Sequence, residues 1–220
     1  MARESMQAKR TRAAEIHRRL QQVYPHAATA LTWRNPFQLL VATILSAQCT
    51  DEVVNQVTPA LFRKYPTPQA LAAAEQTELE RDIYRTGFFR NKARSLKGMA
   101  QALIMDFGGR VPETMAQIVT LPGVARKTAN VVLQEGIHPE GPFAGIVVDT
   151  HVKRVTYRLG LTRETNPDKV ECDLMALLPN EAWRGFANAV ILLGRQYCMA
   201  RNPNHAACPV ECLCPKIGVT

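Results

Sequence analysis

Apolar residues recur along most of the chain at intervals of three or four, the spacing that gathers side chains on one face of an α-helix. Segment 36–48 is apolar on most sides and begins with Pro36, which favours a core helix. Segments 136–145 and 198–220 are broken by Pro or Gly and predict loops. No segment shows the alternation typical of strands. The pattern predicts an all-α protein with helices over 11–24, 36–48, 51–64, 68–74, 77–84, 91–107, 114–120, 124–135, 150–160, 167–177 and 180–197.

One break between helices carries candidate chemistry. Pro122-Gly123 follows a short helical segment and predicts a turn, because Pro fixes φ and Gly allows unusual backbone angles. The amides from Val124 to Arg126 would then be the unpaired N–H groups of a helix start, which bind anions such as phosphate. Lys127 lies in the first turn of this helix. A lysine beside a phosphate site is either a clamp or a nucleophile.

The charge of the chain indicates its partner. The 220 residues carry a net charge of +8 and a pI near 9.4, which favours a polyanion such as nucleic acid over a basic surface that only aids solubility. Arg10, Arg12, Arg18 and Arg19 are expected on a surface that faces solvent or DNA. The sequence contains no run of roughly 18 apolar residues, so it predicts no membrane span. The N-terminus lacks the apolar core of a secretory signal, so we expect a cytoplasmic protein.

The six cysteines are unevenly distributed. Cys49 and Cys172 stand alone, whereas the other four crowd into the last 23 residues, from 198 to 220. In a cytoplasmic chain such crowding is more typical of a metal or cluster site than of disulfides. The four crowded residues are Cys198, Cys208, Cys212 and Cys214.

Several motifs occur together in one order. The helix–hairpin–helix segment at 114–135 is accompanied by two polar helix boundaries and the cysteine-rich tail. From about Phe37 to Cys214 the chain resembles the endonuclease III family of helix–hairpin–helix DNA glycosylases. The residues that carry the resemblance are Leu45-Ser46-Ala47-Gln48, Thr50-Asp51, Ile118, Leu121, Gly123, Val124, Lys127, Ala129 and Val148-Asp149-Thr150-His151-Val152.

The resemblance implies two catalytic residues. Lys127 would attack C1′ of a damaged nucleoside, and the resulting Schiff base would allow strand cleavage by β-elimination. A helix N-terminus and partial burial would lower the pKa of this lysine. Asp149 would cap the helix at Thr150 and also help to deprotonate Lys127. The implied substrate is double-stranded DNA with a damaged base, of the oxidised pyrimidine class, or an abasic site.

The resemblance also implies a domain organisation and a set of DNA contacts. A helical barrel over 27–145 would carry the hairpin, and residues 1–26 would join 146–220 in a second domain. A monomer would bind DNA in the cleft between the two. A damaged base must leave the stack, so Gln48 would fill the gap and Phe88 would wedge the other strand. The hairpin contacts would come from Leu121, Gly123, Val124, Ala125 and Arg126, with Ala125 where the family usually has glycine.

The cysteine tail departs from the family pattern. The family holds a [4Fe–4S] cluster with Cys-x6-Cys-x2-Cys-x5-Cys, and in that frame Cys198, Cys208 and Cys214 match while His205 replaces the second cysteine. Because clusters prefer thiolate, Cys212 is the preferred fourth ligand and His205 the alternative. We therefore expect a [4Fe–4S] cluster in a loop at 198–214, with a zinc site or loss of the cluster as the alternatives.

Two other functions remain alternatives. A monofunctional glycosylase, such as an adenine glycosylase, would lack the lysine found at position 127. A non-catalytic helix–hairpin–helix module would use Lys127 only to bind phosphate. The presence of Lys127 together with Asp149 and the cysteine tail favours the bifunctional glycosylase and abasic-site lyase.

Overall fold

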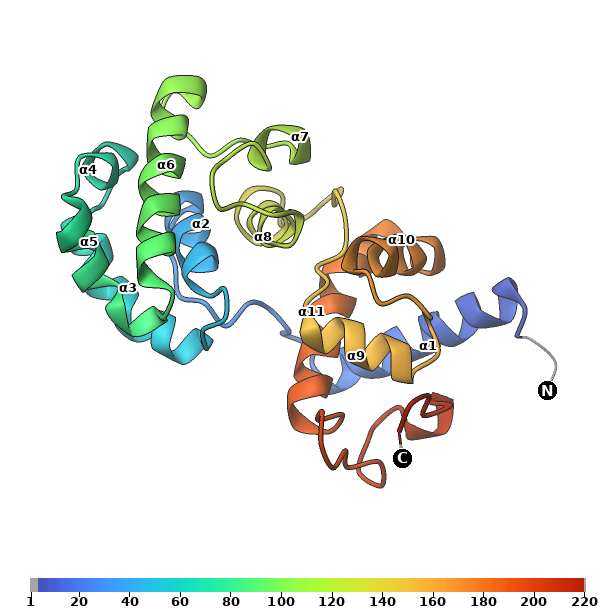
Figure 1. Ribbon diagram of the computed structural model, residues 1–220. Helices are drawn as coiled ribbons and strands as arrows, with labels where there is room; N and C mark the ends of the chain where they lie inside the picture. Colours follow the sequence, from blue (N-terminus) through green and yellow to red (C-terminus); the bar gives the residue numbers. More distant parts are fainter. Residues whose placement is uncertain (1–3, 220) are drawn as a thin grey trace. The chain divides into compact units, whose positions relative to one another are not determined.

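The computed structural model describes residues 4–219 of the chain (Figure 1). Within these residues the regular structure is α-helical, with short 3-10 and π segments and no strand. The predicted all-α class is confirmed. Contacts divide the chain into two compact units, one of residues 1–29 and 140–220 and the other of residues 30–139.

The unit of residues 30–139 is built around one long helix. α6 (Phe89–Phe107) packs against α4 (Pro68–Ala72), α5 (Gln76–Asp82) and α2 (Pro36–Leu45), as Figure 1 shows. Its core consists of fully buried aliphatic side chains, among them Leu39, Leu96 and Leu103. The remaining elements are α3 (Asp51–Lys64), η1 (Tyr84–Thr86), α7 (Met115–Ile118), α8 (Arg126–Val132) and η2 (Leu133–Ile137).

Side-chain caps fix where several of these helices begin. The hydroxyl of Thr50 accepts a hydrogen bond from the Val53 amide at 3.4 Å and so caps the start of α3. Pro36 is the first residue of α2, where its missing N–H costs nothing. The helix predicted over 77–84 begins one residue earlier and ends two residues earlier, as α5 (Gln76–Asp82). Helix α2 also ends sooner than predicted, at Leu45.

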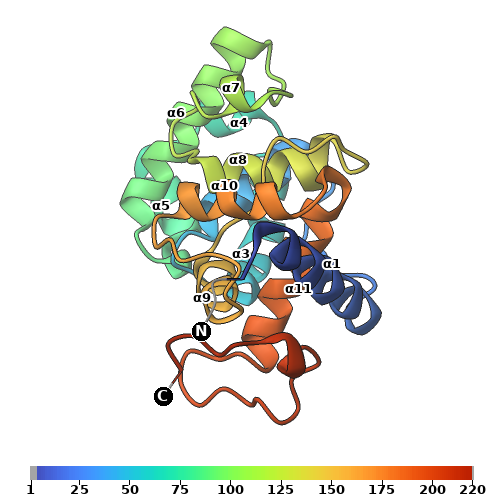
Figure 2. The ribbon, with the colours of Figure 1, turned by 90° about the vertical axis from the view of Figure 1, so that its right-hand side faces the viewer.

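The unit of residues 1–29 and 140–220 packs α1 (Met6–Val23) against α10 (Pro167–Leu177) and α11 (Trp183–Gln196) (Figure 2). α9 (Thr150–Arg158) lies against α11, and Gly194 permits this close approach, because a Cβ there would lie 3.1 Å from His151 and Val155. Short turns η3 (Asn180–Ala182) and η4 (Glu211–Leu213) complete the unit. After α11 the chain runs as an irregular loop through the cysteine-rich tail.

Candidate functional site

The hairpin between α7 and α8 is closed by its own backbone. The Val124 amide donates to the Leu121 carbonyl at 3.1 Å, and the Leu121 amide donates to Ile118 at 3.3 Å. The prediction that the Val124 amide is unpaired is therefore wrong, because the turn itself uses this donor. Leu121 and Val124 are buried. The apolar pair anchors the hairpin while the residues around it stay at the surface.

Gly123 occupies a position that other residues could not adopt without strain. Its φ is +79°, and a Cβ there would lie 2.6 Å from the Cβ of Ser95 on α6. Pro122 lies over the same helix, because a Cβ on Gly98 would come within 3.3 Å of the proline ring. The hairpin is thus seated directly on the long helix of its unit.

Lys127 lies in the first turn of α8 and is exposed. Partial burial of this lysine, expected from the sequence, is not found. Ala125 is the N-cap of α8, with an extended backbone at φ −88°. Its methyl group therefore causes no backbone strain, which is the condition under which alanine can replace the family's glycine.

Two exposed side chains of the same unit stand on strained backbone. Gln48 has φ 53° and Phe88 has φ 48°, both in the left-handed region that non-glycine residues rarely occupy. The Phe88 side chain is 62% exposed, whereas its neighbour Phe89 begins α6 and stacks near Tyr84. Phe89 is partly buried, so Phe88 is the more exposed of the two phenylalanines. Strained and exposed residues are typical of functional sites.

Asp149 lies in the other unit, at the start of α9. Its Oδ1 accepts a hydrogen bond from the Val152 amide at 2.7 Å, so its predicted role as a helix cap is confirmed. The residue is half-buried. Two residues later, burial lowers the pKa of His151, and the Arg154 guanidinium lies 3.2 Å from its Nδ1. His151 and Arg154 support the start of the helix on which Asp149 stands.

A cavity lies between the cysteine-rich loop and the helices α9 and α11. Its wall includes three thiols, of Cys198, Cys208 and Cys214, and the imidazole of His205. Burial raises the pKa of the Cys208 and Cys214 thiols. The rest of the wall is largely apolar, with Val155, Leu159, Leu193, Val210 and Val219.

Cys212 lies elsewhere. It is exposed, and among residues 4–219 it is not one of those that line the cavity. Its Sγ instead accepts a hydrogen bond from Nη1 of Arg19 on α1, at 2.9 Å. The preference for Cys212 as the fourth ligand is therefore not supported, because the short turn η4 directs neighbouring cysteines to different surroundings. Within the described part of the chain, no three His, Cys, Asp or Glu side chains are grouped closely enough to hold a single metal ion.

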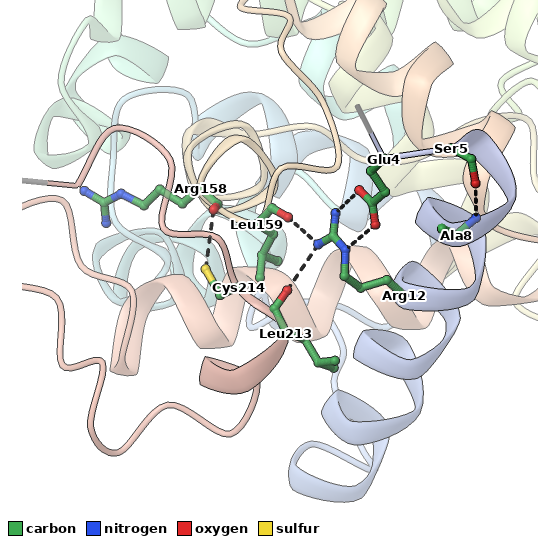
Figure 3. Close-up of polar contacts among 8 residues, drawn as sticks. All are labelled: Glu4, Ser5, Ala8, Arg12, Arg158, Leu159, Leu213 and Cys214. Atoms are coloured by element: carbon green, nitrogen blue, oxygen red, sulfur yellow. Dashed lines mark hydrogen bonds and ion pairs between the residues drawn. The ribbon is translucent and has the colours of Figure 1, made fainter. Parts of the chain in front are cut away.

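Arginines from neighbouring helices hold this loop in place. Arg12 of α1 donates from Nη1 to the carbonyls of Leu159 at 2.6 Å and Leu213 at 3.2 Å, and it forms an ion pair with Glu4 (Figure 3). The expectation that Arg12 lies on an open surface is wrong, since its side chain is only 17% exposed. Arg158 binds the carbonyls of Met199 and Ala200 at 2.7 and 3.0 Å.

Comparison with known proteins places the chain in a family. Residues 41–180 match the family model described as HhH-GPD superfamily base excision DNA repair protein. The chain is 51% identical to endonuclease III of Synechocystis over 96% of its own length and 94% of that protein. It is 44% identical to endonuclease III of Bacillus subtilis, over 87% of its length and 86% of that protein.

Solved structures agree with these relatives. A structure described as a trapped endonuclease III–DNA covalent intermediate is 40% identical, with a TM-score of 0.88 over 94% of this chain and 96% of that one. A non-covalent endonuclease III–DNA complex has the same TM-score of 0.88. None of the helices within residues 4–219 is both long enough and apolar enough to cross a membrane. The chain thus belongs to the endonuclease III family of the HhH-GPD superfamily of base excision DNA repair proteins.

Proposed function

We propose that this protein is a base excision repair enzyme, a bifunctional DNA glycosylase and abasic-site lyase in which Lys127 is the nucleophile. The observation that carries the proposal is the position of Lys127, exposed in the first turn of the helix that follows the family's hairpin. A relative with the same fold has been trapped as a covalent intermediate with DNA. The proposed substrates are duplexes with an oxidised pyrimidine or an abasic site.

The proposed reaction replaces the glycosidic bond by a bond to Lys127 and then breaks the bond to the 3′ phosphate. The neutral Lys127 amine attacks C1′, and the glycosidic bond breaks with its electron pair leaving on the base. The C1′–O4′ bond then breaks, O4′ takes a proton, and C1′ forms a Schiff base with Lys127, an electron sink that allows loss of a C2′ proton and departure of the 3′ phosphate. Water finally hydrolyses the Schiff base and frees the lysine. Because Lys127 is exposed in the protein alone, we infer that bound DNA, rather than the protein core, removes water from this amine.

Asp149 is proposed to take the proton from the lysine ammonium. Its helix-cap hydrogen bond occupies one carboxylate oxygen, and a carboxylate has a second oxygen with which to accept a proton. The cap also fixes the direction of the side chain. Asp149→Asn is therefore expected to keep the cap and lose the base, with a rate loss on the order of a hundredfold or more.

DNA binding is proposed to use the hairpin and two inserting side chains. The hairpin residues Leu121, Gly123, Val124, Ala125 and Arg126 would place backbone groups against a phosphate. Gln48 would fill the gap left by the extruded base, and Phe88 would separate neighbouring bases of the opposite strand. The exposure and fixed backbone of both side chains support these roles.

The family generally carries a [4Fe–4S] cluster, and we propose that this chain holds one in the cavity of the cysteine loop. The donor set fits, because three thiols and one imidazole, those of Cys198, Cys208, Cys214 and His205, line this cavity. His205 is the proposed fourth ligand in place of Cys212, since an imidazole can replace a thiolate on iron. A cluster supplies no step of the reaction above; it links segments of a loop that is otherwise irregular.

Borohydride reduction on abasic DNA tests the catalytic proposal. The wild type should form a covalent adduct, and Lys127→Ala should form none while still binding the duplex. A wild type that releases the base from a duplex with one oxidised thymine, but forms no adduct on abasic DNA, would indicate a monofunctional glycosylase. A wild type that binds without any reaction would indicate a non-catalytic binding module.

Paired substitutions test the ligand proposal. Cys212→Ala should retain iron, sulfide and the broad visible absorption of a cluster, whereas His205→Ala should lose most of them. Nitrogen-14 couplings in pulsed electron paramagnetic resonance of the reduced or oxidised cluster should be present in the wild type. Loss of iron in Cys212→Ala, with iron retained in His205→Ala and no nitrogen coupling, would identify Cys212 as the fourth ligand. A colourless protein that contains zinc would rule out the cluster.

The remaining expectations follow from the proposed activity. We propose that the protein acts as a monomer on double-stranded DNA. We also propose that it acts in the cytoplasm. The net charge of +8 supports binding to the DNA backbone. Weaker binding at higher salt would be the corresponding measurement.

A further inference from the structure

One buried lysine has no role in the reaction proposed above. Lys92 lies in the first turn of α6, and only 6% of it is exposed. Burial lowers the pKa of Lys92, while the neighbouring Cys49 opposes that change. A buried ammonium is unfavourable unless its donors are satisfied, so its contacts show what keeps it there.

The Lys92 ammonium joins two segments of backbone. Nζ donates to the carbonyl of Leu45 at 2.8 Å and to the carbonyl of Thr86 at 2.7 Å. Leu45 is the last residue of α2, where carbonyls lack a partner within the helix and positive charge is favoured. Thr86 is the last residue of η1. A single nitrogen atom therefore holds the ends of α2 and η1 together.

Each of these segments leads directly to a side chain proposed to enter DNA. Gln48 follows Leu45 by three residues, and Phe88 follows Thr86 by two. Both have left-handed backbone, at φ 53° and 48°, which persists only where the surrounding structure fixes it. The polar anchor shared by the two loops is the Lys92 ammonium.

We infer that Lys92 is a positioning residue that sets the spacing between the Gln48 and Phe88 loops, so that both side chains enter the duplex together. The inference rests on the function proposed for those two residues. Spacing matters because the two side chains act on the same opened base pair, and a displacement of about 1 Å can cost on the order of a hundredfold in rate.

A second lysine of α6 supplies a matched control. Lys97 donates from Nζ to the carbonyl of Ala74 at 2.6 Å, just beyond α4, away from both inserting loops. Lys92→Met and Lys97→Met each remove one ammonium and keep the aliphatic stem. Both should fold, by circular dichroism, with some loss of thermal stability.

The two variants should differ in the opening of DNA. On a duplex with one oxidised thymine, Lys92→Met should lower kcat on the order of tenfold or more and change KM much less. The reason is that the two buried carbonyls at the base of the loops lose their shared donor. 2-Aminopurine placed opposite the lesion should lose its fluorescence increase on binding. Lys97→Met should stay within about twofold of the wild type in both measurements.

A double-mutant cycle separates positioning from a merely structural role. In a Gln48→Ala/Phe88→Ala background, Lys92→Met should cost less than about twofold, because the side chains that it positions are gone. A full and additive loss in that background would overturn the inference. Wild-type behaviour of the Gln48→Ala/Phe88→Ala protein would overturn the proposed insertion, and the inference with it.

A conservative variant covers the case in which Lys92→Met does not fold. Lys92→Gln keeps two N–H donors without the charge. Its kcat and its fluorescence increase should lie between those of the wild type and those of the Gln48→Ala/Phe88→Ala protein. The structure of Lys92→Gln would show whether its amide still reaches both carbonyls. If it does not, and kcat and fluorescence nevertheless equal those of the wild type, the inference is contradicted.

Discussion

The hairpin and the cysteine loop are both irregular, yet they are held in different ways. The hairpin closes through its own backbone hydrogen bonds and buries Leu121 and Val124. The cysteine loop has backbone turns of its own, but it is also held from outside, by Arg12 and Arg158, and it surrounds a cavity. The proposed functions explain the difference: a short loop that would present backbone to DNA needs a fixed shape of its own, whereas a loop that would hold a cofactor can take its shape from what it encloses.

This difference predicts where each loop is sensitive to substitution. The hairpin should be sensitive to added volume, because Gly123 and Pro122 lie directly on α6. The cysteine loop should be sensitive to loss of donors, because its carbonyls depend on arginines of other elements. The following substitutions test the comparison in order of decreasing expected effect.

Gly123→Ala should have the largest effect. The added Cβ would lie 2.6 Å from that of Ser95 and would stand at φ +79°, so we expect a loss of unfolding free energy of about 2 to 4 kcal/mol. DNA affinity should fall as well, since the hairpin must shift. Urea denaturation and fluorescence anisotropy with an abasic duplex measure the two effects.

Gly108→Ala is the matched control for Gly123→Ala. Gly108 has a similar φ of +59°, but a Cβ there would meet nothing within 4 Å. It should cost only the backbone strain, about 1 kcal/mol, and leave DNA affinity unchanged. Equal losses in the two variants would show that contact with α6 does not shape the hairpin.

Arg12→Met should have the next largest effect. The carbonyls of Leu159 and Leu213 would lose a charged donor, at a cost of about 2 kcal/mol in the free energy of unfolding. The variant should also release iron faster on mild heating. Arg18→Met is the control: the Arg18 side chain is 57% exposed and paired with Glu15, so its loss should leave the free energy of unfolding nearly unchanged.

Ala125→Gly should have the smallest effect. Residue 125 already has extended backbone at φ −88°, so glycine relieves no strain and costs about 0.5 kcal/mol or less at this helix cap. Removal of the methyl group should let a phosphate approach the backbone more closely and raise affinity for an abasic duplex by about twofold. An unchanged or lower affinity would mean that the phosphate does not approach this residue.

Much of the fold could be predicted from the chain alone. Apolar spacing and turn residues defined most helices, and α3 and α10 have the predicted bounds, 51–64 and 167–177. The sequence predicts the end of a helix less well where the surrounding backbone, rather than a Gly or Pro, ends it. The predicted helix over 36–48 ends at Leu45, where the chain turns into the left-handed backbone of Gln48.

The polar anchors were harder to predict, because they depend on tertiary contacts. Arg12 looks like any exposed arginine of a basic helix, and its carbonyl partners lie more than a hundred residues away in sequence. Lys92 did leave a signal that sequence reasoning missed. It stands on the same helical face as Leu96, Met99 and Leu103, where a charged residue is unexpected unless it is paired.

The most direct test of the catalytic proposal is the identity of the amine that joins DNA. The wild-type protein should be reduced with borohydride on an abasic duplex, digested with nuclease and protease, and mapped by mass spectrometry. The account predicts that the sugar remnant is attached to Nζ of Lys127 and to no other amine in major amount. Attachment mainly to another lysine or to the N-terminal amine would contradict it.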